Sequence, residues 1–221
     1  DLGRFFATRG YVFVSQDVRG RYDSGGEFHA FVNETRDGYD SHEWASTQSW
    51  SNGKVGTYGN SYVGLTQLLP SFLGNPHLEA MIPLVTTTDV YNNWMYSDGA
   101  FQLGFSLSWG GILIDGRVNQ SVTPYDWPKL FENASSKAIQ AAGRRVPHYD
   151  ECVNHPTLDD YWKSIMMDDH RRVQAPAMFV GGWYDIFLRG MIQDYLELVE
   201  AAASKGTQSD HKLIIGPWVH G

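Results

Sequence analysis

The first part of the chain alternates between short apolar runs and amphipathic stretches. Residues 11–20 (YVFVSQDVRG) are rich in β-branched and aromatic side chains and predict a buried strand. Residues 34–47 place apolar positions at helical spacing, which predicts a helix. A strand over 53–59, a helix over 61–74 and a strand over 78–85 continue the pattern. Strands that alternate with helices are typical of a parallel sheet with helices on its faces.

The pattern changes between Thr86 and about Asp169. Glycine, tryptophan and polar residues mix in this stretch, and helical periodicity, as in residues 130–145, occurs without strands between the helices. We therefore expect residues 88–171 to form a helical cap that is inserted into the sheet domain.

Sheet-forming periodicity resumes after the insertion. Residues 175–185 predict a strand that ends at a loop, residues 190–203 a helix, and residues 211–220 a last strand with its exit loop. The predicted fold class is therefore α/β. Residues 1–87 and 172–221 are expected to form a core with a mostly parallel central sheet.

Composition restricts the classes of function. The 221 residues include 17 Lys and Arg against 25 Asp and Glu, a formal net charge of −8, whereas nucleic-acid binding needs clustered basic side chains. No apolar run approaches the roughly 18 residues of a membrane span. Cys152 is the only cysteine, so no internal disulfide is expected. The chain opens on Asp1 without a visible signal peptide, and we expect a cytoplasmic protein that binds neither nucleic acid nor membrane.

Three of the predicted strand exits carry reactive side chains. Ser61 follows KVGTYGN, Asp185 follows AMFVGGWY, and His220 follows LIIGPWV. Functional groups gather outside the carboxyl ends of the strands of an open parallel sheet, so we expect these three to meet. A serine hydroxyl becomes a nucleophile when an imidazole takes its proton, and a carboxylate fixes the tautomer of that imidazole. The chain order serine, aspartate, histidine is the order of α/β-hydrolases.

The glycine-rich stretch GTYGNSYVG (56–64) departs from the common nucleophile elbow. That elbow, G-x-S-x-G, has glycines two residues before and two residues after the serine. Here Gly59 lies two residues before Ser61, but Val63 lies two residues after it and Gly64 comes one later. Taken alone, the stretch leaves open whether Ser61 is a nucleophile on a strained turn or an ordinary serine in a flexible loop.

Four ordered motifs resemble a known enzyme family. In chain order they read YVFVSQDVRGRYDSGGEF, ETRDGYDSHEWASTQSWSNGKVGTYGNSYVG, VGGWYDIF and IIGPWVH. They are similar to the serial motifs of the cocaine esterase and X-Pro dipeptidyl-peptidase group, which includes the α-amino-acid ester hydrolases and glutaryl acylases. The resemblance runs from about residue 11 to residue 220 and implies an α/β-hydrolase fold. The box of that family is G-x-S-Y-x-G, which the late glycine of this sequence fits.

The resemblance implies a role for each residue of the site. Ser61 is the expected nucleophile, His220 the base and Asp185 the acid, and the backbone N–H of Tyr62 is the expected oxyanion donor. The other oxyanion donor of the family is a tyrosine hydroxyl upstream of the strand over 11–20. Neither that loop nor the carboxy-terminal jelly-roll domain of the family is found in this sequence. The chain is therefore expected to be truncated at its N-terminus and to lack the jelly-roll.

The reaction is left open between related classes. The first hypothesis is a serine hydrolase that cleaves carboxylic esters, with amides as a further substrate class, through an acyl-enzyme. One alternative is an X-Pro dipeptidyl peptidase, or an α-amino-acid ester or β-lactam acylase. The other is an inactive fragment or binding module of a larger hydrolase. The expected partner is a small-molecule ester or a short peptide, no cofactor is implied, and homo-oligomerisation is left open.

Several candidate site residues have a structural interpretation beside the functional one. Asp185 is also a suitable cap for the helix that follows it. Trp94, Phe101, Trp109 and Trp183 are candidates for a substrate pocket, but aromatic side chains are as common in a core as in a pocket.

Acidic residues at regular spacing form a second group with two interpretations. Glu34, Asp37 and Asp40 recur every three residues, and we expect a solvated helix face or pairing with Arg19 and Arg21. Histidines, acids and cysteine do not occur at metal-ligand spacing, so we expect no metal site.

Overall fold

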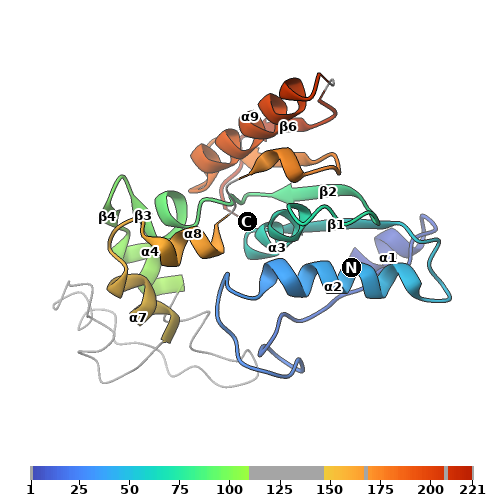
Figure 1. Ribbon diagram of the computed structural model, residues 1–221, viewed down its shortest axis with the longest axis horizontal. Helices are drawn as coiled ribbons and strands as arrows, with labels where there is room; N and C mark the ends of the chain where they lie inside the picture. Colours follow the sequence, from blue (N-terminus) through green and yellow to red (C-terminus); the bar gives the residue numbers. More distant parts are fainter. Residues whose placement is uncertain (1, 110–146, 167–168, 207–208, 221) are drawn as a thin grey trace.

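The computed structural model describes residues 2–109, 147–166, 169–206 and 209–220 (Figure 1). A four-stranded sheet lies at its centre. The strands stand in the order β1 (Val55–Asn60), β2 (Leu78–Leu84), β5 (Met178–Gly182) and β6 (Lys212–Gly216), and each neighbouring pair is parallel. This arrangement confirms the predicted α/β class with a mostly parallel central sheet.

The pairing register brings the carboxyl ends of the strands to a common edge. Asn60, the last residue of β1, lies opposite Leu84 at the end of β2, and Leu84 also lies opposite Val180 of β5. Gly182 and Gly216, the last residues of β5 and β6, lie opposite each other. The loops that follow β1, β5 and β6 therefore leave the sheet at the same edge.

Three helices pack beside the sheet (Figure 1): α2 (Glu34–Thr47), α3 (Tyr62–Ser71) and α9 (Leu188–Ser204). The helix predicted over 34–47 has the predicted bounds, and the other two helices differ from prediction by a few residues at their ends. Helices α3 and α9 bury apolar residues at helical spacing, which stabilises each of them beyond its own propensity. The residues that α2 buries are polar: Glu34, His42 and Ser46.

Helix α3 lies between two hydrophobic cores. Leu68 of α3 and Phe72, which directly follows this helix, belong to a cluster with strand residues and with Met191 and Leu198 of α9. Leu65 belongs to a second cluster, which we call the aromatic core. A helix that is apolar on several sides is typical of a buried position, and α3 begins directly after Ser61.

The strand predicted over 11–20 is absent, which corrects that interpretation. The described residues of this segment adopt no regular secondary structure, and Tyr11 and Val12 are 65% and 57% exposed. A β-branched run becomes a strand only where a neighbouring strand takes its backbone hydrogen bonds. Among the described residues no strand pairs with it, although Phe13 stacks on Phe6, which in turn contacts Tyr58 of β1.

Most of the remaining elements lie beside one end of the sheet (Figure 1). They are the π-helix η1 (Tyr91–Met95), the antiparallel strands β3 (Tyr96–Ser97) and β4 (Ala100–Phe101), and helices α4 (Leu103–Ser108), α7 (Pro147–Asn154) and α8 (Asp160–Ile165). The short helix α1 (Leu2–Ala7) and the 3-10 helix η3 (His170–Arg172) lie elsewhere in the chain order. The helix predicted over 130–145 lies outside the described residues, and the extent of the cap over 88–171 stays a prediction.

The aromatic core joins these elements to α3 and to the loop before α2. Trp94 and Trp162 are fully buried in it, and Phe31 and Phe187 join it from segments far apart in the sequence. Its buried members are Ala30, Phe31, Leu65, Leu69, Val90, Tyr91, Trp94, Met95, Tyr96, Trp109, Cys152, Trp162, Ile165 and Phe187.

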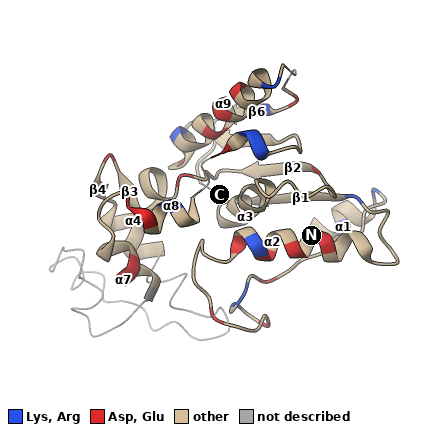
Figure 2. Cartoon of the chain, viewed as in Figure 1, with Lys and Arg blue, Asp and Glu red and all other residues tan. Residues whose placement is uncertain are grey.

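Charged side chains are scattered over several elements, with acidic and basic residues interspersed (Figure 2). Asp37 pairs with Arg19 at 2.6 Å, which confirms one of the two interpretations for the acidic residues of α2. Glu34 is an exception, because it is buried rather than solvated. Within the described residues, no helix combines the length and the apolar character that crossing a membrane requires.

Candidate active site

Ser61 occupies a strained turn between β1 and α3. Its backbone has φ 55° and ψ −126°, a conformation that costs a non-glycine residue about 1–3 kcal/mol. Hydrogen bonds on both sides hold the turn. The Ser61 N–H donates to the carbonyl of Leu84 at 2.9 Å, and the Ser61 carbonyl accepts from the N–H groups of Gly64 and Leu65 at 2.9 and 3.0 Å. The side chain therefore stands at the carboxyl edge of the sheet on a fixed backbone.

The packing of the turn explains the late glycine of the sequence. A Cβ on Gly59 would lie 2.4 Å from Cγ1 of Val63, so the side chain two residues after Ser61 fills the space above this glycine. A Cβ on Gly64 would lie 2.7 Å from Cγ2 of Thr86, at the end of the neighbouring strand. The close approach of α3 to β2 therefore falls at Gly64, and Val63 is accommodated.

Gln67 braces the same turn from inside the molecule. Its buried amide nitrogen donates to the carbonyls of Gly59 and Val63, both at 3.1 Å, and its amide oxygen accepts from the N–H of Ile82 at 3.2 Å. One side chain thus links β1, α3 and β2 and satisfies backbone groups that would be costly to bury unpaired.

Asp185 lies in the loop that follows β5, with its side chain fully buried. One carboxylate oxygen accepts from the N–H of Phe187 at 2.7 Å. The other lies 2.6 Å from Nδ1 of His220. From the sequence, Asp185 has two interpretations, as a helix cap and as the partner of the histidine. Each applies to a different carboxylate oxygen, because one oxygen binds the backbone ahead of α9 and the other faces His220.

The loops after β5 and β6 are fastened to each other. The N–H of Trp183 donates to the carbonyl of Gly216 at 2.9 Å, and the N–H of Tyr184 donates to the carbonyl of Trp218 at 3.0 Å. A Cβ on Gly182 would lie 2.1 Å from the Trp218 carbonyl oxygen, so only glycine allows this approach. These contacts fix the separation of the loops that carry Asp185 and His220.

His220 bridges Ser61 and Asp185. Its Nδ1 lies 2.6 Å from Asp185 Oδ2 and its Nε2 lies 2.9 Å from Ser61 Oγ. A carboxylate only accepts hydrogen bonds, so Nδ1 carries the proton, and in a neutral ring Nε2 is then free to accept from the serine hydroxyl. The ring also packs edge-on against Phe187, with centroids 5.0 Å apart.

Tyr62 follows Ser61 and begins α3. Among the described residues no backbone or side-chain acceptor receives a hydrogen bond from its N–H, which belongs to the open first turn of the helix. The Tyr62 side chain points into the protein and packs against the aromatic core. The structure therefore gives the predicted oxyanion donor an unpaired N–H beside the serine.

Three of the four candidate pocket residues lie in or against the aromatic core, where Trp94 and Trp109 are in ring contact, and Trp183 lies apart from them. Trp94 is fully buried, and its ring packs at a tilt against Phe187, with centroids 4.2 Å apart. Because Phe187 contacts His220, this part of the aromatic core backs the site rather than opening onto it. Trp109 and Phe101 also pack in or against the aromatic core, whereas Trp183 is 62% exposed. A role for these residues in binding substrate stays a prediction.

Cys152 has the surroundings of a structural residue rather than of a nucleophile. It is buried in the aromatic core, where burial raises the pKa of its thiol well above the usual range. A thiol that stays protonated is a poor nucleophile. In the described residues no group of three or more His, Cys, Asp or Glu side chains could hold a metal ion.

Comparisons with known proteins relate this chain to a family of hydrolases. Residues 2–221 match the model of the X-Pro dipeptidyl-peptidase family (S15 family). The cocaine esterase of a Rhodococcus species is 30% identical over 233 residues, which cover 97% of this chain and 39% of that protein.

Solved structures share the fold. An α-amino acid ester hydrolase has a TM-score of 0.78 and 26% identity and covers 99% of this chain, which in turn covers 39% of that chain. A CocE/NonD family hydrolase from Staphylococcus aureus has a TM-score of 0.64 and 25% identity, with 91% of this chain and 32% of that chain covered. The chain thus spans well under half the length of these relatives.

The family match extends over nearly all residues, and the fold and the ordered motifs agree with it. The chain therefore belongs to the X-Pro dipeptidyl-peptidase (S15) family.

Proposed function

We propose that this chain carries the nucleophile, base and acid of a serine hydrolase that cleaves carboxylic esters through an acyl-enzyme. The observation that carries the proposal is the position of His220, whose two ring nitrogens lie within hydrogen-bond distance of Ser61 and Asp185 at the same time. A serine hydroxyl next to a neutral imidazole, itself held by a buried carboxylate, has the arrangement needed for nucleophilic attack.

The chemistry proceeds in two halves. His220 Nε2 takes the proton of Ser61 as Oγ attacks the ester carbonyl carbon, and the charge that develops on the carbonyl oxygen is met by the N–H of Tyr62. The tetrahedral intermediate collapses, the ester C–O bond breaks, and the imidazolium returns its proton to the leaving alkoxide. A water molecule then attacks the acyl-enzyme by the same route and releases the carboxylic acid.

Asp185 stabilises the imidazolium that forms in each half. Its charge lies 2.6 Å from Nδ1 and is held in place by the Phe187 N–H, so the carboxylate does not need to move when the ring becomes charged. The named esterase relative at 30% identity supports an ester as the first substrate class to test. An X-Pro anilide, which has an amide bond, is the matching test for the dipeptidyl-peptidase alternative.

A fluorophosphonate probe tests the proposal. We expect one covalent label per chain and turnover of an aryl ester, and both should be lost in Ser61→Ala. Ser71→Ala is the matched control, because Ser71 lies at the far end of the same helix and, in the described residues, its hydroxyl donates only to the Leu68 carbonyl. Labelling that persists in Ser61→Ala, or is lost equally in the control, would contradict the assignment. A chain that neither labels nor turns over substrate would instead favour the binding-module alternative.

A further inference from the structure

A chain of two hydrogen bonds runs behind the candidate oxyanion donor. The N–H of Phe31 donates to the hydroxyl oxygen of Tyr62 at 2.9 Å, and the Tyr62 hydroxyl lies 2.5 Å from Oε1 of Glu34. A hydroxyl has one proton and accepts with its lone pairs. Because the Phe31 N–H uses a lone pair, the Tyr62 proton is left to donate to the carboxylate.

The environment keeps that proton on the tyrosine. Burial raises the pKa of Tyr62 well above its usual range, and the neighbouring Glu34 charge acts in the same direction. The hydroxyl therefore stays a donor at neutral pH. The direction of the hydrogen-bond chain, from Phe31 through Tyr62 to Glu34, is thereby fixed.

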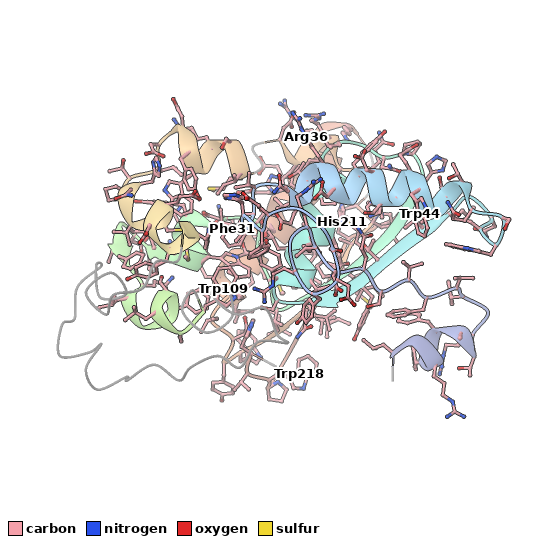
Figure 3. All side chains as sticks on the ribbon, turned by 90° about the horizontal axis from the view of Figure 1, so that it is seen from below. Phe31, Arg36, Trp44, Trp109, His211 and Trp218 are labelled. Atoms are coloured by element: carbon pink, nitrogen blue, oxygen red, sulfur yellow. The ribbon has the colours of Figure 1, made fainter. Side chains whose placement is uncertain are left out.

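The ring of Tyr62 is held as firmly as its hydroxyl. It packs against Phe31, Trp109 and Trp94, with centroids 5.5, 5.9 and 6.3 Å away. Figure 3 shows Phe31 and Trp109 side by side in the interior, where their rings stack 5.5 Å apart. A tyrosine side chain has two rotatable bonds. Fixing the ring and the hydroxyl therefore fixes the Tyr62 Cα, and with it the direction of the Tyr62 N–H.

Two features of this arrangement are unfavourable for stability. Phe31 has φ 70°, a left-handed conformation that is strained for a side chain of this kind. Glu34 is 95% buried, and its second oxygen has no hydrogen-bond partner among the described residues. Burial raises the pKa of this carboxyl, which reflects the cost of holding its charge away from water. Maximal stability alone does not explain a buried acid whose second oxygen has no partner in the part of the chain that the structure describes.

We propose that Glu34 is a positioning residue, which sets the oxyanion N–H of Tyr62 by anchoring the hydroxyl of the same side chain. Glu34 does not touch the reacting atoms; it acts through Tyr62, the residue directly after Ser61. This role rests on the proposed function. With Glu34 included, the candidate site extends from the edge of the sheet to the first turn of α2.

The test compares variants that remove either end of the anchor. Tyr62→Phe deletes one oxygen and keeps the backbone N–H, and Glu34→Leu removes the acceptor. A displaced oxyanion donor affects the transition state more than the bound substrate, so we expect kcat for an aryl ester to fall about 10- to 100-fold with little change in KM. Inhibition by an arylboronic acid, which forms a tetrahedral adduct on the serine, should weaken by the same factor. Glu34→Gln keeps an acceptor oxygen and should retain most of the wild-type kcat.

Each kcat is divided by the concentration of active sites, which is measured by titration with a fluorophosphonate. A smaller fraction of folded protein is then not mistaken for a lower kcat. Tyr96→Phe is the matched control, because Tyr96 belongs to the aromatic core but its hydroxyl donates to the Cys152 carbonyl at 2.9 Å. Glu43→Leu is the control on α2, where Glu43 accepts from Asn75 at 2.9 Å. Both should keep the wild-type kcat per titrated site.

The outcomes separate the two proposals. A kcat per titrated site that is unchanged in Tyr62→Phe and Glu34→Leu would overturn the positioning role while leaving the hydrolase intact. An equal fall in Tyr96→Phe would overturn it as well, since the effect would then be general to the core. If the wild-type chain takes up no probe at Ser61, the hydrolase proposal fails first and the positioning role fails with it.

Discussion

At the scale of single residues, the contacts of Asp185 predict what happens when its charge is removed and its shape is kept. Asp185→Asn keeps the size of the side chain and an oxygen that can face Phe187, but an amide nitrogen beside His220 would favour the wrong tautomer of the ring. Nε2 would then carry the proton and could no longer accept from Ser61. We expect kcat for an aryl ester to fall by about 10³- to 10⁴-fold, measured per folded chain by steady-state kinetics.

Asp194→Asn is the matched control for this prediction. Asp194 is also a buried aspartate, but it lies on α9 and accepts from the Thr88 N–H and hydroxyl, at 2.8 and 2.5 Å. Its replacement should lower the thermal midpoint and leave kcat nearly unchanged. An Asp185→Asn variant with wild-type kcat would contradict the proposed acid.

The three reactive residues could be named from the sequence because each follows a strand, and parallel strands end at one edge. Their catalytic role stays a prediction. Glu34 was missed because acids spaced by three residues have the appearance of a solvated helix face. Its burial depends on Tyr62, which lies 28 residues away. Local periodicity contains no signal for a contact of that kind.

At the scale of elements, Gly64 decides how closely α3 can approach β2. In Gly64→Ala, the new methyl group would lie 2.7 Å from Cγ2 of Thr86 and 3.1 Å from the Leu84 carbonyl oxygen. Either the helix or the strand end must shift, and we expect a loss of about 1–3 kcal/mol in the free energy of unfolding. Because Ser61 precedes this helix, its labelling rate should fall too. Urea unfolding and probe kinetics measure the two effects.

Gly104→Ala controls for the general effect of alanine in a helix. Gly104 lies in α4, and a Cβ there would meet no atom of the described residues within 4 Å. Because alanine has the higher helix propensity, this variant should be neutral or slightly stabilising. If Gly64→Ala were equally harmless, the close packing described for the turn would not constrain it.

Element boundaries were predictable where tertiary contacts agreed with local pattern. Helix α2 has the bounds that its spacing predicts, and it packs against α3, where a Cβ on Gly38 would lie 2.7 Å from Cγ of Pro70. The residues that α2 buries are polar, however, and Trp44 is 52% exposed. The segment 11–20 has an equally strong local pattern but no strand beside it. Backbone pairing is a property of two segments, so the sequence of one segment could not reveal its absence.

At the scale of the whole molecule, the aromatic core couples the elements beyond the sheet to the candidate site. Residues from the loop before α2, from η1 and from α7 meet there, and Phe187 links them to His220. The alternation of strands and helices predicted the sheet. The aromatic core could not be predicted in the same way, because its members are scattered over the sequence and only their three-dimensional arrangement brings them together.

His148 makes this core sensitive to acid. It lies on α7 against Phe31 and Trp109, and burial lowers its pKa to about 3 from an ordinary value near 6.5. Above pH 6.5 the ring is neutral in both the folded and the unfolded chain, so it imposes no penalty. Below that pH, His148 binds a proton in the unfolded chain but stays neutral in the folded chain. Stability is therefore lost progressively as the pH falls from about 6.5 towards 3.

We expect this one histidine to contribute up to about 1.4 kcal/mol per pH unit to the fall in the free energy of unfolding. In His148→Leu, the free energy of unfolding should fall less steeply between pH 6 and pH 4, by about that amount per pH unit, whatever its value at pH 7. Urea titrations at a series of pH values measure this slope. His155→Gln is the control. The His155 ring is 35% exposed and lies 2.7 Å from Asp159, outside the aromatic core, so its replacement should not flatten the curve. Equal slopes for wild type and His148→Leu would mean that the folded protein admits a proton to this position, and that the aromatic core opens to water at mild acid pH.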